Sequence, residues 1–168
     1  MSLGLIQVQA GELLTAYTAA EIAAGKTVPA GAFFLDGISA YIFLINADVA
    51  AITPGVACVS ATTAQRAAFN CLIGTGGAGL TGCLYAGTRA LLAANVAVGG
   101  GGWFQCKGPT TFATSTIATC LPAVIIAAGA VAAMPNTGVG ASEVIGIAAD
   151  AGVGGNALVY VNRNIWGI

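Results

Sequence analysis

The stretch NVAVGGGGWFQCKGPTTF, residues 95 to 112, places four consecutive glycines directly before Trp103 and Phe104. Glycine reaches positive φ without steric cost, so a glycine run before an apolar run favours a tight corner that leads into a β-strand. A second stretch has the same form: AANVAVGG at 93–100 is similar to AADAGVGG at 148–155, and the runs WFQC and LVYV follow them. We therefore predict that both glycine pairs are corners before strands.

Further strand-like runs surround these corners, each apolar or β-branched and bounded by Gly, Pro or Asn. They are YIFLIN (41–46), GVACVSAT (55–62), WFQCK (103–107), SEVIGIAA (142–149) and NALVYVN (156–162). Helical patterns are weaker: one covers residues 11–25, and a second covers residues 62–72 with Thr62 or Thr63 as its cap.

Together these runs predict a mainly β protein: a small β-barrel or β-sandwich domain with one or two short helices and an extended N-terminal segment. We divide the chain into an N-terminal extension (1–30), the barrel or sandwich domain (31–161) and a C-terminal tail (162–168). The 168 residues are enough for one domain with a sizeable core.

The composition is unusually poor in charge. Only 7 % of the residues are charged, against about 25 % in ordinary soluble domains, while 57 % are hydrophobic. Such a surface is poorly protected against association, so we expect a protein that is packed against partners. The net charge is −1 and the five Lys and Arg are scattered, which argues against nucleic acid as a partner.

Enzyme chemistry is not expected from these residues. The chain has no His, its six carboxylates are far apart in sequence, and no paired nucleophile and base is evident. The stretch AEIAAGKT at 20–27 has the relaxed form of a phosphate-binding loop, but Pro29 follows and no helix is expected after it. We therefore predict no catalytic site, no metal, no cofactor and no small-molecule substrate.

The five cysteines are odd in number and form no CxxC pair. This pattern differs from the even, dense framework of disulfide-stabilised domains. We predict free and mostly buried thiols, with no disulfide within the chain.

The sequence favours neither a secretion signal nor a membrane-spanning helix. The first 14 residues lack the positive and continuous apolar regions of a secretion signal. Residues 117–134 are uncharged and approach the length of a spanning helix, but most of them are Ala and Gly, and Pro122 lies inside. We expect no membrane partner, and a membrane protein is only the third alternative.

Residues 110–120, TTFATSTIATC, are rich in threonine. Threonine fits the pleat of an ordinary strand, but a flat array of hydroxyl groups also suits glycan or ice. A glycan- or ice-binding β module of a fibre or secreted protein is therefore the alternative function.

Four motifs are informative together: GWFQCKGP after the glycines, IGIAADA, the closing LVYV, and upstream the hairpin-like VPAGAFFLDGISAY. With these motifs the chain, chiefly over residues 85–161, resembles the capsid decoration proteins of tailed bacteriophages. The resemblance covers under half of the chain, and residues 1–30 and the ending NRNIWGI have no counterpart in it.

The resemblance implies a small β-barrel or β-sandwich that trimerises on the outside of an expanded icosahedral head. There it would cement neighbouring capsomers of the major capsid protein, after synthesis in the host cytoplasm. The expected partners are the major capsid protein and further copies of the chain, and the expected location is the outer capsid surface of the virion.

The interface residues are predicted from strand alternation and from the apolar ends. Alternation after the glycines puts Phe104 and Cys106 on one face of the strand and three residues on the other. We expect Phe104 in the core and Trp103 at a subunit interface or rim. Apolar ends would fray in a lone domain, so we expect them to contact another copy or the shell. The predicted interface is Leu5, Ile6, Trp103, Gln105, Lys107, Ile165, Trp166 and Ile168.

Overall fold

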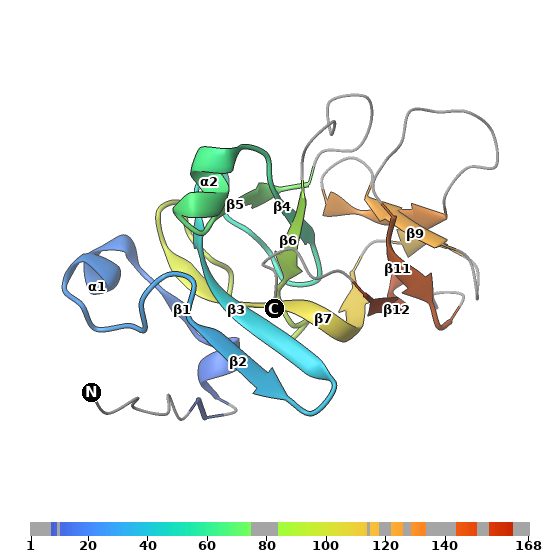
Figure 1. Ribbon diagram of the computed structural model, residues 1–168, viewed down its shortest axis with the longest axis horizontal. Coiled ribbons are helices and arrows are strands. Elements are labelled where there is room, and N and C mark those ends of the chain that lie inside the picture. The colour runs from blue at the N-terminus through green and yellow to red at the C-terminus, as the bar shows by residue number, and fades with distance from the viewer. Residues whose placement is uncertain are drawn as a thin grey trace.

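The computed structural model describes residues 8–9, 11–74, 84–113, 115–117, 122–125, 129–133, 144–150 and 155–162 (Figure 1). The strands are β1 (Ala16–Tyr17), β2 (Phe33–Asp36), β3 (Ser39–Asn46), β4 (Ala57–Ser60), β5 (Asn70–Ile73), β6 (Leu84–Thr88), β7 (Gly101–Phe112), β8 (Ser115–Thr116), β9 (Pro122–Ile125), β10 (Val131–Ala133), β11 (Val144–Ala148) and β12 (Ala157–Val161). The helices are η1 (Glu12–Leu14, a 3-10 turn), α1 (Ala19–Ala23) and α2 (Thr63–Ala67).

Five strands close into a mixed β-barrel, which confirms the predicted mainly β fold. Their order is β3-β5-β4-β6-β7, and β7 pairs back with β3 to close the ring. The β3–β5 pair is parallel and the other pairs are antiparallel. The predicted hairpin upstream is also present, because β2 pairs with β3 from Phe33↔Ile42 to Asp36↔Ser39.

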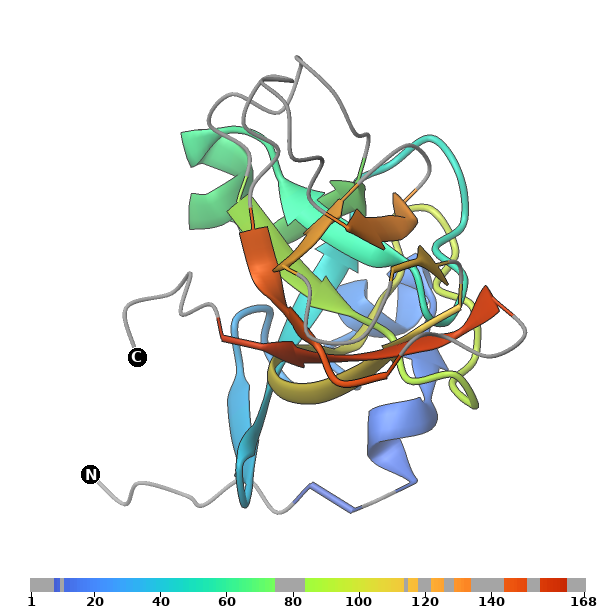
Figure 2. The same ribbon diagram turned by 90° about the vertical axis from the view of Figure 1, so that its right-hand side faces the viewer.

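Strand β7 belongs to the barrel and to a second sheet. Its first half pairs with β3, and its second half pairs with β12, from Phe112↔Ala157 to Gly108↔Val161. The two halves meet at Gly108, whose φ of +95° is a conformation that few other residues adopt. From β12 the second sheet continues through β11, β9, β10 and β8, and Figure 2 shows β12 running alongside β7.

The molecule has two cores, one inside the barrel and one between the barrel and the second sheet. Both form on the same strands because neighbouring residues of a strand point to opposite faces. On β4, Cys58 faces the barrel interior, while Ala57 and Val59 face the second sheet. On β6, Ala86 and Tyr85 divide in the same way. All four residues of β4 are buried, as expected for a strand between two cores.

The predicted helix over residues 11–25 is wrong in extent. The segment forms η1, then β1, then α1, because Thr15 and Thr18 both have extended backbone. Thr18 begins α1 with a capping box to Glu21. The second predicted helix is confirmed in its first part: α2 starts after Thr62, which forms a capping box with Gln65, and β5 follows it.

Both predicted corners are present. Gly99 has φ +73° and precedes β7, and Gly155 has φ +88° and precedes β12. The apolar stretch at 117–134 contains β9 and β10 in its described part. Among the residues that the structure describes, no helix is long and apolar enough to cross a membrane.

Candidate functional site

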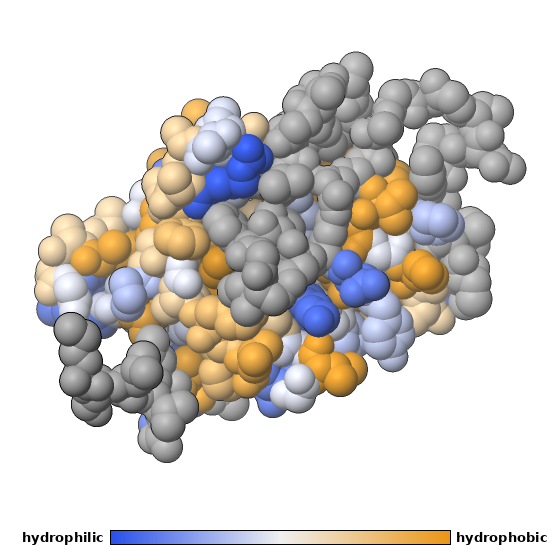
Figure 3. Space-filling view, in the orientation of Figure 1, coloured by the Kyte–Doolittle hydropathy of each residue, from blue (hydrophilic) through white to orange (hydrophobic). Residues whose placement is uncertain are grey.

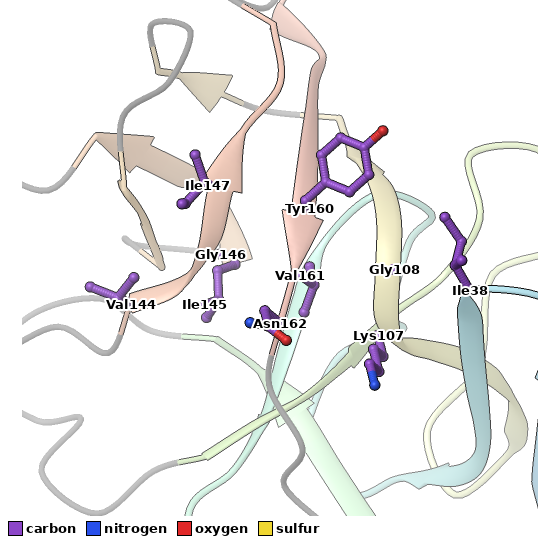
Figure 4. A pocket seen from close by; sticks show the side chains of 10 residues that line it. All are labelled: Ile38, Lys107, Gly108, Val144, Ile145, Gly146, Ile147, Tyr160, Val161 and Asn162. Carbon is purple, nitrogen blue, oxygen red and sulfur yellow. The ribbon is translucent and has the colours of Figure 1, made fainter.

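An apolar groove of about 550 Å³ crosses the outer face of the second sheet. Figure 4 shows its walls: β11 on one side, β12 in the middle, and the turn between β2 and β3 opposite, with β7 between. It is lined by Ile38, Lys107, Gly108, Val144, Ile145, Gly146, Ile147, Tyr160, Val161 and Asn162.

Large apolar side chains in this groove are exposed to solvent. Ile38 is 70 % exposed, Ile147 57 % and Tyr160 51 %. Ile147 and Tyr160 are exposed because β11 and β12 turn one face to the inner core, and no described element covers the other, whereas Ile38 lies in the turn between β2 and β3. In the space-filling view, hydrophobic patches and a few hydrophilic residues alternate over this part of the molecule (Figure 3). The groove is therefore a surface with the size and character of a binding site.

Of the three predicted interface residues on β7, only Lys107 lies in the groove and is exposed. Gln105 is buried, and its side-chain amide donates to Ser39 Oγ at 3.2 Å and to the main-chain oxygens of Lys107 at 3.2 Å and Pro109 at 2.8 Å. Phe104 is fully buried in the barrel core, which confirms the expected face.

Trp103 is not at a rim, and this expectation is wrong. It is 2 % exposed, and its ring packs edge-on against Phe43 at 5.7 Å and Phe34 at 6.4 Å between centroids. The β2–β3 hairpin supplies both rings, so both faces of β7 are covered here. The other predicted interface residues, Leu5, Ile6, Ile165, Trp166 and Ile168, lie outside the described residues.

A second exposed apolar surface lies at the far end of β3. Val49 is 96 % exposed and Val98 is 55 % exposed, on two loops that the Ile52↔Val96 bridge joins. We call Val49 and Val98 the apolar knob. The sequence did not single them out, because loop valines carry no pattern that predicts exposure.

Hydrogen bonds hold the Val49 loop in one shape. The buried Asn46 donates from Nδ2 to Ala50 O at 2.9 Å and to Val96 O at 3.0 Å. The carboxylate of Asp48 accepts from the main-chain N–H groups of Val49 at 2.6 Å and Ala50 at 3.3 Å, and from that of Ile73 at 2.8 Å. The knob is thus preorganised, which lowers the entropic cost of binding.

Arg89 joins the N-terminal segment to the barrel, and sequence reasoning missed it. Its side chain is fully buried, and its acceptors within the described chain are main-chain carbonyls. They are Leu13 O at 3.2 Å, Leu14 O at 3.0 Å, Thr15 O at 3.1 Å, Ala94 O at 3.1 Å and Trp103 O at 2.7 Å. Three of these follow one another at the end of η1, where carbonyls lack helical partners.

The glycine run makes room for this arrangement. A Cβ on Gly100 would lie 2.5 Å from Tyr17 O, and one on Gly102 would lie 2.8 Å from Arg89 Nη1. β1 pairs with β7 at these glycines, Ala16↔Gly102 and Tyr17↔Gly101. We call Arg89, its five carbonyl acceptors and residues 100–102 the Arg89 clasp.

Burial lowers the pKa of Arg89 to about 10, so the side chain is still a cation at neutral pH. Its guanidinium carbon lies 5.7 Å from the centre of the Phe104 ring, a distance suited to a cation–π contact. Among the described residues, Arg89 Nε is the buried side-chain polar atom that has no hydrogen-bond partner.

The described cysteines agree with the predicted free thiols. Cys58, Cys71 and Cys106 are unpaired and buried, whereas Cys83 and Cys120 lie outside the described residues. Burial raises the pKa of the Cys58 thiol well above its ordinary value and that of Cys106 to about 11. Within the described ranges, no three His, Cys, Asp or Glu come together as a metal site would require.

Two other sequence features have a structural explanation. Gly25 lies in the stretch similar to a phosphate-binding loop and follows the end of α1 with φ +65°. The N–H groups of this stretch therefore follow a helix, whereas a phosphate-binding loop precedes one. In the threonine-rich stretch, Thr110 is buried and Thr111 half-buried, so these two hydroxyl groups form no flat exposed array.

The described chain is therefore a closed mixed β-barrel with a second sheet that carries an apolar groove. No protein-family model matches the chain, and no curated protein or solved structure is significantly similar to it.

Proposed function

We propose that this chain is a structural virion protein that decorates and cements the outer surface of a tailed-phage icosahedral capsid. Its partners in this role are the major capsid protein and further copies of itself. The virion's outer surface is its location, and its contribution is mechanical: it holds neighbouring capsomers of the expanded head together.

The observation that supports this proposal most is the pair of exposed apolar surfaces on a closed barrel. The groove and the apolar knob expose Ile147, Tyr160 and Val49 on a chain in which only 11 side chains carry formal charge. Surfaces of this kind mark contacts with other proteins. The resemblance of residues 85–161 to capsid decoration proteins points to the same class of protein.

The mode of attachment follows from the same composition. Exposed ion pairs contribute about 0–1 kcal/mol and are screened by molar salt, whereas apolar burial contributes about 25 cal/mol per Å² before the costs of association. Attachment should therefore survive molar NaCl and be reversed by urea, which solvates apolar and peptide groups.

The test adds the purified protein to expanded heads that lack it, washes the heads in molar NaCl, and pellets them. We expect the protein to stay bound and to raise the temperature at which the heads rupture, because it binds the intact shell. Unexpanded heads and heads that already carry the protein serve as controls. Release by salt alone would indicate an electrostatic mode, and an unchanged rupture temperature at full occupancy would exclude the cementing role.

A further inference from the structure

The groove and the apolar knob lie at opposite ends of strand β3. Ile38, in the groove, immediately precedes β3, and Val49, in the knob, follows its last residue, Asn46, by three positions. An eight-residue strand is roughly 25 Å long. The Asn46 and Asp48 hydrogen bonds fix the knob at its end, so the knob of one molecule cannot reach the groove of the same molecule.

The two surfaces match in character. The groove is apolar, and among the described residues that line it Lys107 is the charged one. The knob presents Val49, which is 96 % exposed, and the residue before it is the half-buried Asp48, whose carboxylate accepts three main-chain N–H groups of its own chain and still carries a negative charge beside Val49. An aliphatic side chain in the groove would thus bring a negative charge toward a positive one, and attraction of this kind sets orientation and partner choice.

We propose that the groove is the docking site for a second copy of this chain, which inserts its apolar knob, with Val49 in the groove and the negative charge of Asp48 on the side of Lys107. Because the two surfaces differ, the contact is head-to-tail, and repeating it produces a closed ring or an open chain of copies. A ring of three agrees with the trimer expected from the sequence. The inference rests on the proposed function only for the expectation of self-association, and its test needs no capsid.

The test uses two variants that each damage one side of the contact. Val49→Asp places a second charge on the knob, and Ile147→Asp places a charge in the groove. Both side chains are more than half exposed, so we expect both variants to fold, with unchanged circular dichroism and urea midpoints. Leu35→Asp is the matched control, because Leu35 is 64 % exposed on β2, outside both surfaces.

Sedimentation should show self-association of the wild type and of Leu35→Asp. Each of the other variants should bind itself roughly tenfold more weakly or worse, because a charge replaces the buried aliphatic group. The decisive sample is the mixture. Val49→Asp retains an intact groove and Ile147→Asp retains an intact knob, so an equimolar mixture should form a one-to-one dimer and nothing larger.

Each other outcome overturns the proposal. A wild type that is monomeric at the highest attainable concentration shows that copies do not dock in this way. A mixture that stays monomeric shows that the two surfaces do not meet. If Ile147→Asp loses association and Val49→Asp keeps it, another occupant fills the groove, such as residues 163–168. Failure to bind capsids in the experiment above, with dimers in the mixture, would refute the proposed function alone.

Discussion

The Arg89 clasp and the groove differ in how their side chains are satisfied. In the clasp, a buried cation and the carbonyls at the end of η1 satisfy one another, and the glycines of β7 give them room. In the groove, Ile38, Ile147 and Tyr160 stay in water although they are large and apolar. The comparison teaches that the clasp finds its hydrogen-bond partners within one chain, with Arg89 Nε as the exception, whereas the groove leaves apolar groups exposed for the partner that we propose. Stability should therefore depend on the first region and association on the second.

The largest effect is expected from Arg89→Met. The carbonyls of the clasp would lose the guanidinium, and Leu14 O would keep the main-chain N–H of Ala94 as a donor, so the free energy of unfolding should fall by roughly 3–5 kcal/mol. Urea denaturation measures this loss. Arg66→Met on α2 is the control and should cost about 0.5 kcal/mol, because Arg66 is only half-buried. Equal losses in the two variants would mean that the clasp does not hold the barrel together.

A smaller effect is expected from Gly100→Ala. The new Cβ would meet Tyr17 O at 2.5 Å, and a main-chain oxygen held in a strand pair cannot move aside easily, so roughly 1–3 kcal/mol should be lost. Gly11→Ala is the control, because nothing lies within 4 Å of its Cβ position. If both variants unfold at the wild-type urea concentration, β1 does not lie against the glycine run.

Alkaline pH should weaken the barrel core by a further, smaller amount. Burial raises the pKa of Cys106 from its ordinary 9.0 to about 11, so the unfolded chain releases this proton first. The stability that depends on the neutral thiol is then complete below pH 9 and is lost as the pH rises toward 11, by roughly 1–2 kcal/mol. Unfolding of wild type and Cys106→Ala, compared at pH 8 and pH 10.5, isolates this thiol. The same slope in both proteins would contradict the burial of Cys106.

The smallest effect on stability is expected in the groove itself. Ile147→Ala should change the free energy of unfolding by about 0.5 kcal/mol, since the side chain is 57 % exposed in the folded chain. Ile145→Ala, two residues earlier on β11, should cost about 2–5 kcal/mol because Ile145 is 1 % exposed. A large loss in Ile147→Ala would place this residue in the core and remove the contrast between the two regions.

Local signals in the sequence predicted much of the fold correctly. Alternation placed Phe104 in the core, the glycine pairs marked the corners before β7 and β12, and Thr62 marked the start of α2. These features depend on backbone angles and on near neighbours in the chain, so short stretches are enough to predict them.

The same signals failed where distant segments decide burial. Alternation put Trp103 on the face opposite Phe104, but it could not show that the β2–β3 hairpin covers that face as well. The pattern at 11–25 suggested one helix, yet pairing with β7 and the carbonyl contacts to Arg89 hold the middle of it extended. Of the predicted interface on β7, Lys107 alone is exposed in the groove.

The sequence by itself determined a mainly β chain with glycine corners, very little charge and, at the three described cysteines, buried free thiols. Only the tertiary structure decided which apolar residues stay exposed and which charge is buried. The physical reason is range: a glycine's φ or a strand's alternation is set by adjacent residues, whereas three of the carbonyls that accept from Arg89 lie 74 to 76 positions away along the chain. Burial of a charge depends on partners that only the folded chain brings within reach.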